Sequence, residues 1–332
     1  MKTKLGVLVG ARSFANRVAG RPICVSFEVT HSCSADCLHC DKGRMKREDG
    51  RILPADYGRW SRELRPAVTQ LSGGEPLTRP DLEDIARAVR RPSGLPLIVC
   101  ITNGWALSEE RFASLREAGV NMFSVSLDFP DVRHDSFRQL RGLFDRLERV
   151  VPRLAAIDRA NGISDGIVLN TALTHANFRE IPALVETAES WGVRISFSAY
   201  SHLRTGERGF CITDPEDLKE LERGFAYLRE RRRRTGSVLN SDYVLDTTLD
   251  FFREQGRGGC QAGVRFLVVR PDGELNPCSM HPDHRYPSRK EAVRGFTVRH
   301  ECRDCYVSIR SLTERPLVHL AADSFAIFSQ LR

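Results

Sequence analysis

Short runs of β-branched and apolar residues alternate with amphipathic helical stretches over the first 200 residues, and this alternation limits the fold more than any other feature. The apolar runs, which predict strands, lie at 23–30, 67–72, 96–102, 121–127, 166–173 and 193–199. The stretches that predict helices lie between them at 54–64, 80–91, 108–118, 135–158 and 178–191. Strands that alternate with such helices form parallel sheets with crossover connections. The pattern predicts an α/β fold, a partial (β/α)6 barrel with functional residues at the carboxyl ends of its strands.

Changes in composition along the sequence mark the boundaries of five segments. We divide the sequence into a basic amphipathic segment (1–22), the barrel (23–200), a helical connection (201–257), a small domain rich in Gly, Pro and Cys (258–312) and a closing helix (313–332). In the first segment the apolar residues fall on one helical stripe, which contains Leu5, Leu8, Val9, Phe14 and Val18. A basic helix with such a stripe permits peripheral membrane contact. Packing of this helix against the barrel is the alternative.

Composition excludes several classes of function. The chain has 332 residues, of which 41% are hydrophobic, and this is enough for a sizeable core. The net charge of +7 is spread along the sequence rather than clustered, so we expect no nucleic-acid partner. No stretch approaches the roughly 20 apolar residues of a membrane span. Because no secretory signal is present either, we expect a cytoplasmic protein.

The ten cysteines are distributed unevenly. In a reducing compartment thiols serve metals or chemistry more often than disulfides. One group contains Cys33, Cys37 and Cys40, a second contains Cys260, Cys278, Cys302 and Cys305, and the others are Cys24, Cys100 and Cys211. The grouping predicts two metal sites.

The first group reads CSADCLHC and follows the first predicted strand directly. Three thiolates on one short loop can bind three irons of a [4Fe-4S] cluster and leave the fourth iron open, because soft sulfur ligands suit iron-sulfur centres. Zinc is the competing metal, but structural zinc sites close all four positions. A loop with three cysteines therefore favours the cluster.

The second predicted strand is followed by GGEP, which comprises Gly73, Gly74, Glu75 and Pro76. Paired glycines let a backbone approach a ligand closely, and an unpaired Glu beside them accepts from an ammonium group. A CxxxCxxC loop followed by GGEP resembles the radical S-adenosylmethionine (SAM) superfamily. The resemblance implies a TIM-like partial barrel in which the open iron chelates SAM and the GGEP backbone binds the amino group of SAM.

Further matches to that superfamily follow along the barrel. ITNG (101–104), SVSLD (124–128) and HDSFR (134–138) resemble its later strand ends, and the matched residues imply that Asn103, Ser126 and Arg138 contact SAM. The strand VLNTALT implies that Leu169 and Asn170 lie near the adenosine. One departure is His39, where the superfamily more often has an aromatic residue, and it puts the packing of the adenine in question.

The second cysteine group resembles the auxiliary-cluster module called twitch, a shortened SPASM module. Gly273 lies between Cys260 and Cys278, Cys302 and Cys305 follow, and no cysteine comes after them. Four cysteines imply a small C-terminal iron-sulfur (twitch) domain with one fully ligated [4Fe-4S] cluster. Structural zinc is the alternative, because His281, His284 and His300 lie nearby and imidazole is a good zinc ligand.

The other candidate functional residues belong to no recognisable motif. Cys24 and Cys100 lie in apolar strands, where a free cysteine behaves as a small hydrophobe, and Cys211 lies in a loop as a candidate thiol. The residues that follow strand ends or lie in the connection are candidates to face the substrate: Asp128, Tyr200, His202, Asp242 and Tyr243. No spacing selects a general base among them.

The resemblance implies a radical SAM oxidoreductase that cleaves SAM reductively and abstracts hydrogen from a substrate carbon. A fully ligated auxiliary cluster is then the expected electron acceptor, and a flavodoxin- or ferredoxin-type protein the expected reductant. We expect a small-molecule substrate, namely a sugar, isoprenoid or lipid. The alternatives are maturation of a ribosomally made peptide and, more remotely, a zinc-bound module without enzymatic activity.

Overall fold

A curved sheet of eight strands forms the centre of the protein. The structure, a computed structural model, describes residues 2–44, 51–316 and 319. The strands are β1 (Cys24–Thr30), β2 (Val68–Gly73), β3 (Leu97–Thr102), β4 (Met122–Ser126), β5 (Ile167–Leu173), β6 (Arg194–Ala199), β7 (Phe266–Val269) and β8 (Leu275–Asn276). Their order in the sheet is β6-β5-β4-β3-β2-β1-β7-β8. Strands β1 to β6 are parallel neighbours, which confirms the predicted partial barrel.

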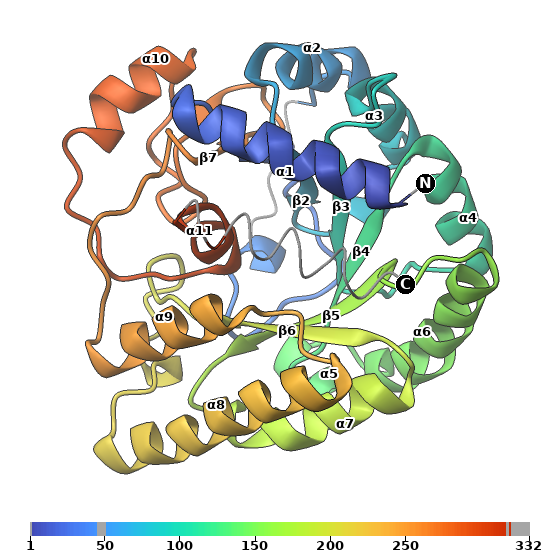
Figure 1. Cartoon of the computed structure of the whole chain (residues 1–332), viewed down its shortest axis with the longest axis vertical. Coiled ribbons are helices and arrows are strands. Elements are labelled where there is room, and N and C mark those ends of the chain that lie inside the picture. The colour runs from blue at the N-terminus through green and yellow to red at the C-terminus, as the bar shows by residue number, and fades with distance from the viewer. Residues whose placement is uncertain (1, 45–50, 317–318, 320–332) are drawn as a thin grey trace.

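Most of the helices surround the sheet (Figure 1). The helices are α1 (Lys2–Val18), α2 (Pro54–Leu64), α3 (Leu82–Val89), α4 (Glu109–Ala118), α5 (Arg133–Arg138), α6 (Leu143–Ala160), α7 (Ile181–Ser190), α8 (Pro215–Thr235), α9 (Asp242–Arg253), α10 (Arg289–Ala292) and α11 (Ser308–Thr313). In the view of Figure 1, α1 crosses in front of the strands and α11 lies near the middle. Apolar residues from the helices and from the outer face of the strands form one large core. Burial of this apolar surface is the main force that closes the barrel.

Two predicted helices differ from the observed ones. The stretch 135–158 is divided into α5 and α6, because Gln139 and Gly142 have left-handed backbone, with φ of 52° and 78°. The stretch 178–191 begins as a short 3-10 helix, Phe178–Glu180, before α7 starts. The predicted closing helix (313–332) falls mostly outside the described residues, and α11 ends at Thr313.

The inner face of the sheet is polar. Side chains alternate between the two faces of a strand, and in β1 the apolar Phe27 belongs to the outer core while Ser26 and Glu28 face inward. The Oγ of Ser26 lies 2.6 Å from the Oγ of Ser72, and Ser196 donates to the Oδ1 of Asn170 across 3.0 Å. The barrel therefore encloses a polar lumen rather than a second apolar core.

The C-terminal cysteine segment continues this sheet. Strand β7 pairs parallel to β1, and β8 returns antiparallel to β7. Because β8 runs back toward the start of β1, Cys278 lies near Cys24, and both belong to a small apolar cluster with Cys260. Strands β6 and β8 form the two edges, so that the barrel has an open side between them.

The N-terminal helix α1 packs on the barrel through polar residues. Nδ2 of Asn16 donates to the carbonyl oxygens of Pro22 and Arg65 at 2.7 and 2.9 Å. On the outer side, Phe14 and Val18 are 56% and 70% exposed. The predicted peripheral membrane contact of this helix stays a prediction. Among the described residues, no helix combines the length and the apolar character needed to cross a membrane.

Candidate functional site

The first cysteine group lies on the loop that leaves the carboxyl end of β1. The Sγ of Cys33 accepts from the Ala35 amide at 3.5 Å, and the Cys40 amide donates to the Cys37 carbonyl at 3.1 Å. Burial raises the pKa of Cys37 to about 12, although the Arg138 charge opposes this rise, and the thiols of Cys33 and Cys40 add to it. The loop therefore brings the three thiols into one electrostatic group, and metal binding would have to displace their protons.

The glycines of GGEP are required by the cysteine loop itself. A Cβ at Gly73 would lie 2.1 Å from the Thr30 carbonyl oxygen, and one at Gly74 would lie 2.1 Å from that of Ser32. The amides of Gly74 and Glu75 donate to these same two oxygens, each at 2.8 Å. The close approach that we predicted between these glycines and a ligand is thus made, in this structure, to the neighbouring loop.

Glu75 differs from its predicted environment. We expected an unpaired carboxylate, but it accepts from the Thr102 hydroxyl and the Asn103 amide, each at 2.7 Å, and from the Leu77 amide at 3.1 Å. Burial raises the pKa of Glu75, against the effect of these hydrogen bonds. The expectation was wrong because three donors from β3 and the turn Pro76–Thr78 converge on it, which the sequence pattern does not reveal. Glu75 joins the ends of β2 and β3.

The other predicted SAM contacts lie at neighbouring strand ends. Nδ2 of Asn103 donates to the Oγ of Ser34 at 3.0 Å, so that this residue links β3 to the cysteine loop. Ser126 and Asn170 are partners in the β4–β5 register and face the lumen. The side chain of Leu169 is fully buried in the outer core and does not line the lumen. Apart from the Leu169 side chain, the structure gathers these residues around one end of the barrel.

Arg138 at the end of α5 lies beside the cysteine loop. Its Nη1 is 3.9 Å from the Sγ of Cys37, and its Nε donates to Oδ2 of Asp128 at 2.7 Å. Asp128 is fully buried, and burial alone would raise its pKa, but the charge and hydrogen bond of Arg138, together with His39 and His134, lower it. Asp128 therefore does not face a substrate as we expected, because it holds Arg138 in place. His39 stacks on Phe137 with ring centroids 4.7 Å apart.

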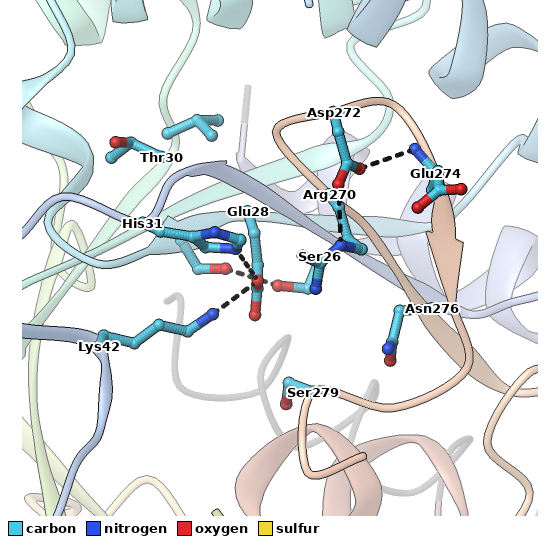
Figure 2. Close-up of polar contacts among 12 residues, drawn as sticks. Ser26, Glu28, Thr30, His31, Lys42, Arg270, Asp272, Glu274, Asn276 and Ser279 are labelled. Atoms are coloured by element: carbon cyan, nitrogen blue, oxygen red, sulfur yellow. Dashed lines mark hydrogen bonds and ion pairs between the residues drawn. The ribbon is translucent and has the colours of Figure 1, made fainter. Parts of the chain in front are cut away.

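A buried charged cluster in the lumen has no counterpart among the predicted site residues. Oε2 of Glu28 lies 2.7 Å from Nζ of Lys42 and 3.0 Å from Nε2 of His31 (Figure 2). Burial would raise the pKa of Glu28, but the Lys42 charge and the His31 bond lower it. Asn276 and Ser279 lie on the β8 side of this cluster (Figure 2), where the amide of Asn276 donates to the His281 carbonyl at 2.9 Å. Glu28 is the one charged residue of β1, CVSFEVT, and this was the signal for it in the sequence.

The second cysteine group gathers at the other end of β1. Cys260, Cys278 and Cys305 are buried, and Cys302 is partly exposed. Cys302 and Cys305 share a hydrogen bond, which together with burial raises the pKa of Cys305, and the thiols of Cys278 and Cys260 add to this rise. Nε2 of His281 lies 3.3 Å from the Sγ of Cys302. The structure thus brings together the four predicted cysteines. Of the three histidines of the zinc alternative, His281 contacts a cysteine sulfur, Nδ1 of His300 accepts from the Cys302 amide at 3.3 Å, and the His284 ring lies 6.0 Å from that of His281.

A buried arginine, which the sequence did not single out, crosslinks this second group. Arg310 has no exposed surface, and its Nη1 and Nη2 donate to the carbonyls of Cys305 and Gly258 at 2.6 and 2.7 Å. Its Nε donates to Glu314 at 2.9 Å. Among so many arginines nothing in the sequence marks this one. Its charge opposes the burial effect that raises the pKa of Cys260 to about 12.

The weaker candidates have structural roles or partners of their own. The Tyr200 hydroxyl bonds to Thr205 at 2.6 Å, and the Sγ of Cys211 lies 3.8 Å from Nδ1 of His202. Asp242 pairs with Arg232 at α8 (3.5 Å). Tyr243 stacks on His319 with ring centroids 4.4 Å apart. Cys24 and Cys100 are buried in strands, as predicted.

Both cysteine groups have donor sets that suit iron-sulfur clusters. Three thiols on one loop and four thiols around Arg310 match the thiolate ligation of [4Fe-4S] centres. In the described ranges, no three His, Cys, Asp or Glu side chains gather tightly enough to bind one metal ion. Each thiolate of a cubane binds its own iron, so that such a cluster does not need three donors around a single ion.

Comparisons with known proteins agree with the motifs. The sequence model described as the radical SAM superfamily matches residues 27–188. An AdoMet-dependent heme synthase of Methanosarcina barkeri is 31% identical over 281 residues, which cover 79% of this chain and 78% of that protein. A PqqA peptide cyclase of Gluconobacter oxydans is 28% identical over 288 residues, with coverages of 82% and 75%. The crystal structure of Streptococcus suis SuiB bound to precursor peptide SuiA superposes with a TM-score of 0.60 at 18% identity, over 93% of this chain and 68% of that one.

Proposed function

Since this chain belongs to the radical SAM superfamily and is therefore an enzyme, we propose that it matures a peptide by radical chemistry with the help of an auxiliary iron-sulfur cluster. The observation that carries this proposal is that two groups of cysteines lie at opposite ends of one polar lumen. The sugar, isoprenoid or lipid substrate that we expected from the sequence finds no support in the relatives, two of which favour the peptide alternative.

The first group would hold the cluster that superfamily members use to bind SAM. Cys33, Cys37 and Cys40 supply three thiolates. When bound, the cluster and SAM supply a 5'-deoxyadenosyl radical that abstracts hydrogen from a substrate carbon. The chain's own contribution is to orient SAM and the substrate and to exclude water from them. Glu75 and the glycines before it fix the cysteine loop against β2 and β3.

The remaining predicted residues would bind SAM around the same strand ends. The GGEP backbone is assigned to the amino group of SAM, and Arg138, fixed by Asp128, to its carboxylate. Asn103 is assigned to the SAM site beside the cysteine loop. Ser126 and Asn170 would contact the nucleoside from β4 and β5, together with the backbone of Leu169. These assignments rest on the motifs and on the gathering of the residues at one end of the barrel.

The second group would hold the auxiliary cluster. Cys260, Cys278, Cys302 and Cys305 together offer four thiolates, and a cluster with four thiolate ligands supplies electron transfer rather than substrate binding. Arg310 places a buried positive charge beside these thiolates. A pair of cysteines with His281 also suits zinc, and the iron content distinguishes the two metals. We keep a flavodoxin- or ferredoxin-type protein as the proposed reductant.

Two relatives support a peptide as the substrate. The PqqA peptide cyclase aligns over 82% of this chain, and the SuiB structure, which shares the fold, contains a precursor peptide. A tetrapyrrole is the second candidate, because the relative with 31% identity is a heme synthase. Polar side chains line the lumen in which either substrate would be attacked, and they offer partners for a peptide backbone.

The first test is metal content after anaerobic reconstitution. We expect about eight irons and eight sulfides in the wild type and about four of each in Cys33→Ala/Cys37→Ala/Cys40→Ala, from two cubane clusters. About four irons in the wild type, all lost in the variant, would remove the auxiliary cluster from the proposal, and zinc in its place would favour the structural alternative.

The substrate class is then tested by deuterium transfer into 5'-deoxyadenosine. Transfer from deuterated peptides encoded beside the gene supports maturation, and transfer only from a deuterated tetrapyrrole favours the second candidate.

A further inference from the structure

Arg204 touches the loops that carry both cysteine groups. It lies on the loop after β6, and its Nη2 is 2.7 Å from Oδ2 of Asp41, the residue after Cys40. Its Nη1 donates to the Ser279 carbonyl, the residue after Cys278, at 2.8 Å. The side chain of Arg204 is only 9% exposed. One guanidinium fork therefore joins the residue next to a ligand of the first group to the residue next to a ligand of the second.

This contact crosses the open side of the barrel. The sheet ends at β6 on one side and at β8 on the other, so that among the strands that the structure describes no ladder of hydrogen bonds joins the two edges. Arg204 comes from the β6 side and reaches the loop after β8. On the same β6 loop, the Oγ of Ser201 donates to the Asp304 carbonyl at 2.9 Å, next to Cys305. The loop after β6 thus closes the barrel by contacts to the second cysteine group.

The charge of Arg204 acts on both groups. Its Nη1 lies 2.8 Å from the carbonyl oxygen of the residue after Cys278, and its Nη2 lies 2.7 Å from the carboxylate of the residue after Cys40. Burial would lower the pKa of Arg204 itself, but the bond to Asp41 and the charges of Glu28 and Cys40 raise it. A planar fork with fixed donors is well suited to hold two oxygens in a defined relation, which a lysine ammonium is not.

We propose that Arg204 is a positioning residue that couples the two cysteine groups: it fixes the loops after β1 and β8 relative to each other and makes the auxiliary cluster easier to reduce. The inference rests on the proposed auxiliary cluster. A cluster that gains an electron gains negative charge, and a buried cation close to it stabilises that state. Electron exchange between the two ends of the lumen would then depend on a residue that binds neither metal.

The test uses the full-length chain with the substitutions Cys33→Ala/Cys37→Ala/Cys40→Ala, so that only the auxiliary cluster is present. Its midpoint potential is measured by dithionite titration followed by electron paramagnetic resonance, with Arg204 intact and as Arg204→Gln and Arg204→Lys. For Arg204→Gln we expect the equilibrium constant for reduction to fall about tenfold, which is a shift of about 59 mV to more negative potential for one electron. Arg204→Lys keeps the charge and should retain most of the potential. The exposed Arg208→Gln, on the same loop, is the matched control for loss of a charge.

The positioning role has its own readout. Without the fork the Ser279 carbonyl loses its donor, so hydrogen–deuterium exchange in 277–282 should become faster in both Arg204 variants and stay unchanged in Arg208→Gln. An unchanged potential in Arg204→Gln at unchanged iron content overturns the electrostatic role. Unchanged hydrogen–deuterium exchange in 277–282 of Arg204→Lys overturns the positioning role. If Arg204→Gln does not fold, Arg204→Lys alone decides whether this role stands. If the background variant with Arg204 intact binds no iron, the auxiliary cluster has failed rather than the role of Arg204.

Discussion

The carboxylate of Asp128 lies 2.6 Å from Nη2 of Arg138, and both side chains are buried beside the first cysteine group. The pair connects the end of β4 to the end of α5. Because the carboxylate fixes the guanidinium, Arg138 has a defined position next to Cys37 before any ligand binds. Pre-positioning of this kind lowers the entropy cost of binding an anionic group.

Replacement of Asp128 should therefore be costly. Removal of one partner from a buried ion pair leaves an uncompensated charge and typically costs about 3–5 kcal/mol. We expect Asp128→Asn to lower the free energy of unfolding by about 3 kcal/mol, measured by urea denaturation at pH 7. The control is Asp131→Asn, which breaks the exposed pair with Arg133 and should cost less than about 1 kcal/mol. Equal losses in the two variants would contradict a special role for the buried pair.

The free energy of unfolding should decrease as the pH is lowered, because of His134. Burial first, and the Arg138 charge second, lower its pKa to about 3, from 6.5 as the ordinary value. Its Nδ1 accepts from the Asp128 amide at 3.1 Å, which requires a neutral ring. Below pH 6.5 the unfolded chain binds a proton that the native state does not, so stability is full above that pH and decreases toward pH 3.

At pH 5 the difference of about 1.5 pH units corresponds to a loss of about 2 kcal/mol from this one group. We expect His134→Gln to have a flatter dependence of unfolding free energy on pH between 7 and 5 than the wild type. Urea denaturation at four or five pH values measures the two slopes. Identical slopes would show that the native state does not lower the pKa of His134.

Gly74→Ala should displace the first cysteine loop. The added Cβ would lie 2.1 Å from the Ser32 carbonyl oxygen and 2.7 Å from that of His31, and these backbone atoms have little room to adjust. Overpacking of this kind costs about 1–3 kcal/mol. We expect the reconstituted variant to lose about four of about eight irons, those of the first cluster. Gly209→Ala, where an added Cβ meets nothing within 4 Å, should keep all of them; full iron content in both variants would contradict the packing argument.

Local patterns predicted the sheet, because strand and helix periodicity depends on neighbouring residues. The cysteine and glycine motifs were predictable for the same reason. The partners of Glu75 and Arg204 were not, because they come mainly from segments 27 or more positions away. Arg138 is only ten positions from Asp128, but side-chain type alone does not show which partner a buried charge meets. Arg204 and Asp41 are 163 positions apart. The break between α5 and α6 was missed because left-handed backbone at a glutamine has no strong sequence signal.

The second cysteine group should depend on Arg310 as much as on its thiols. This side chain has no exposed surface and joins Gly258, two residues before Cys260, to the carbonyl of Cys305. Arg310→Met keeps the length but leaves two buried carbonyls and Glu314 without their donor, so a loss of about 3–5 kcal/mol is expected. In the Cys33→Ala/Cys37→Ala/Cys40→Ala background, Arg310→Met should reduce iron from about four to near zero. The exposed Arg299→Met on a neighbouring segment should retain it, and retention in both would mean that the four cysteines are held together without this arginine.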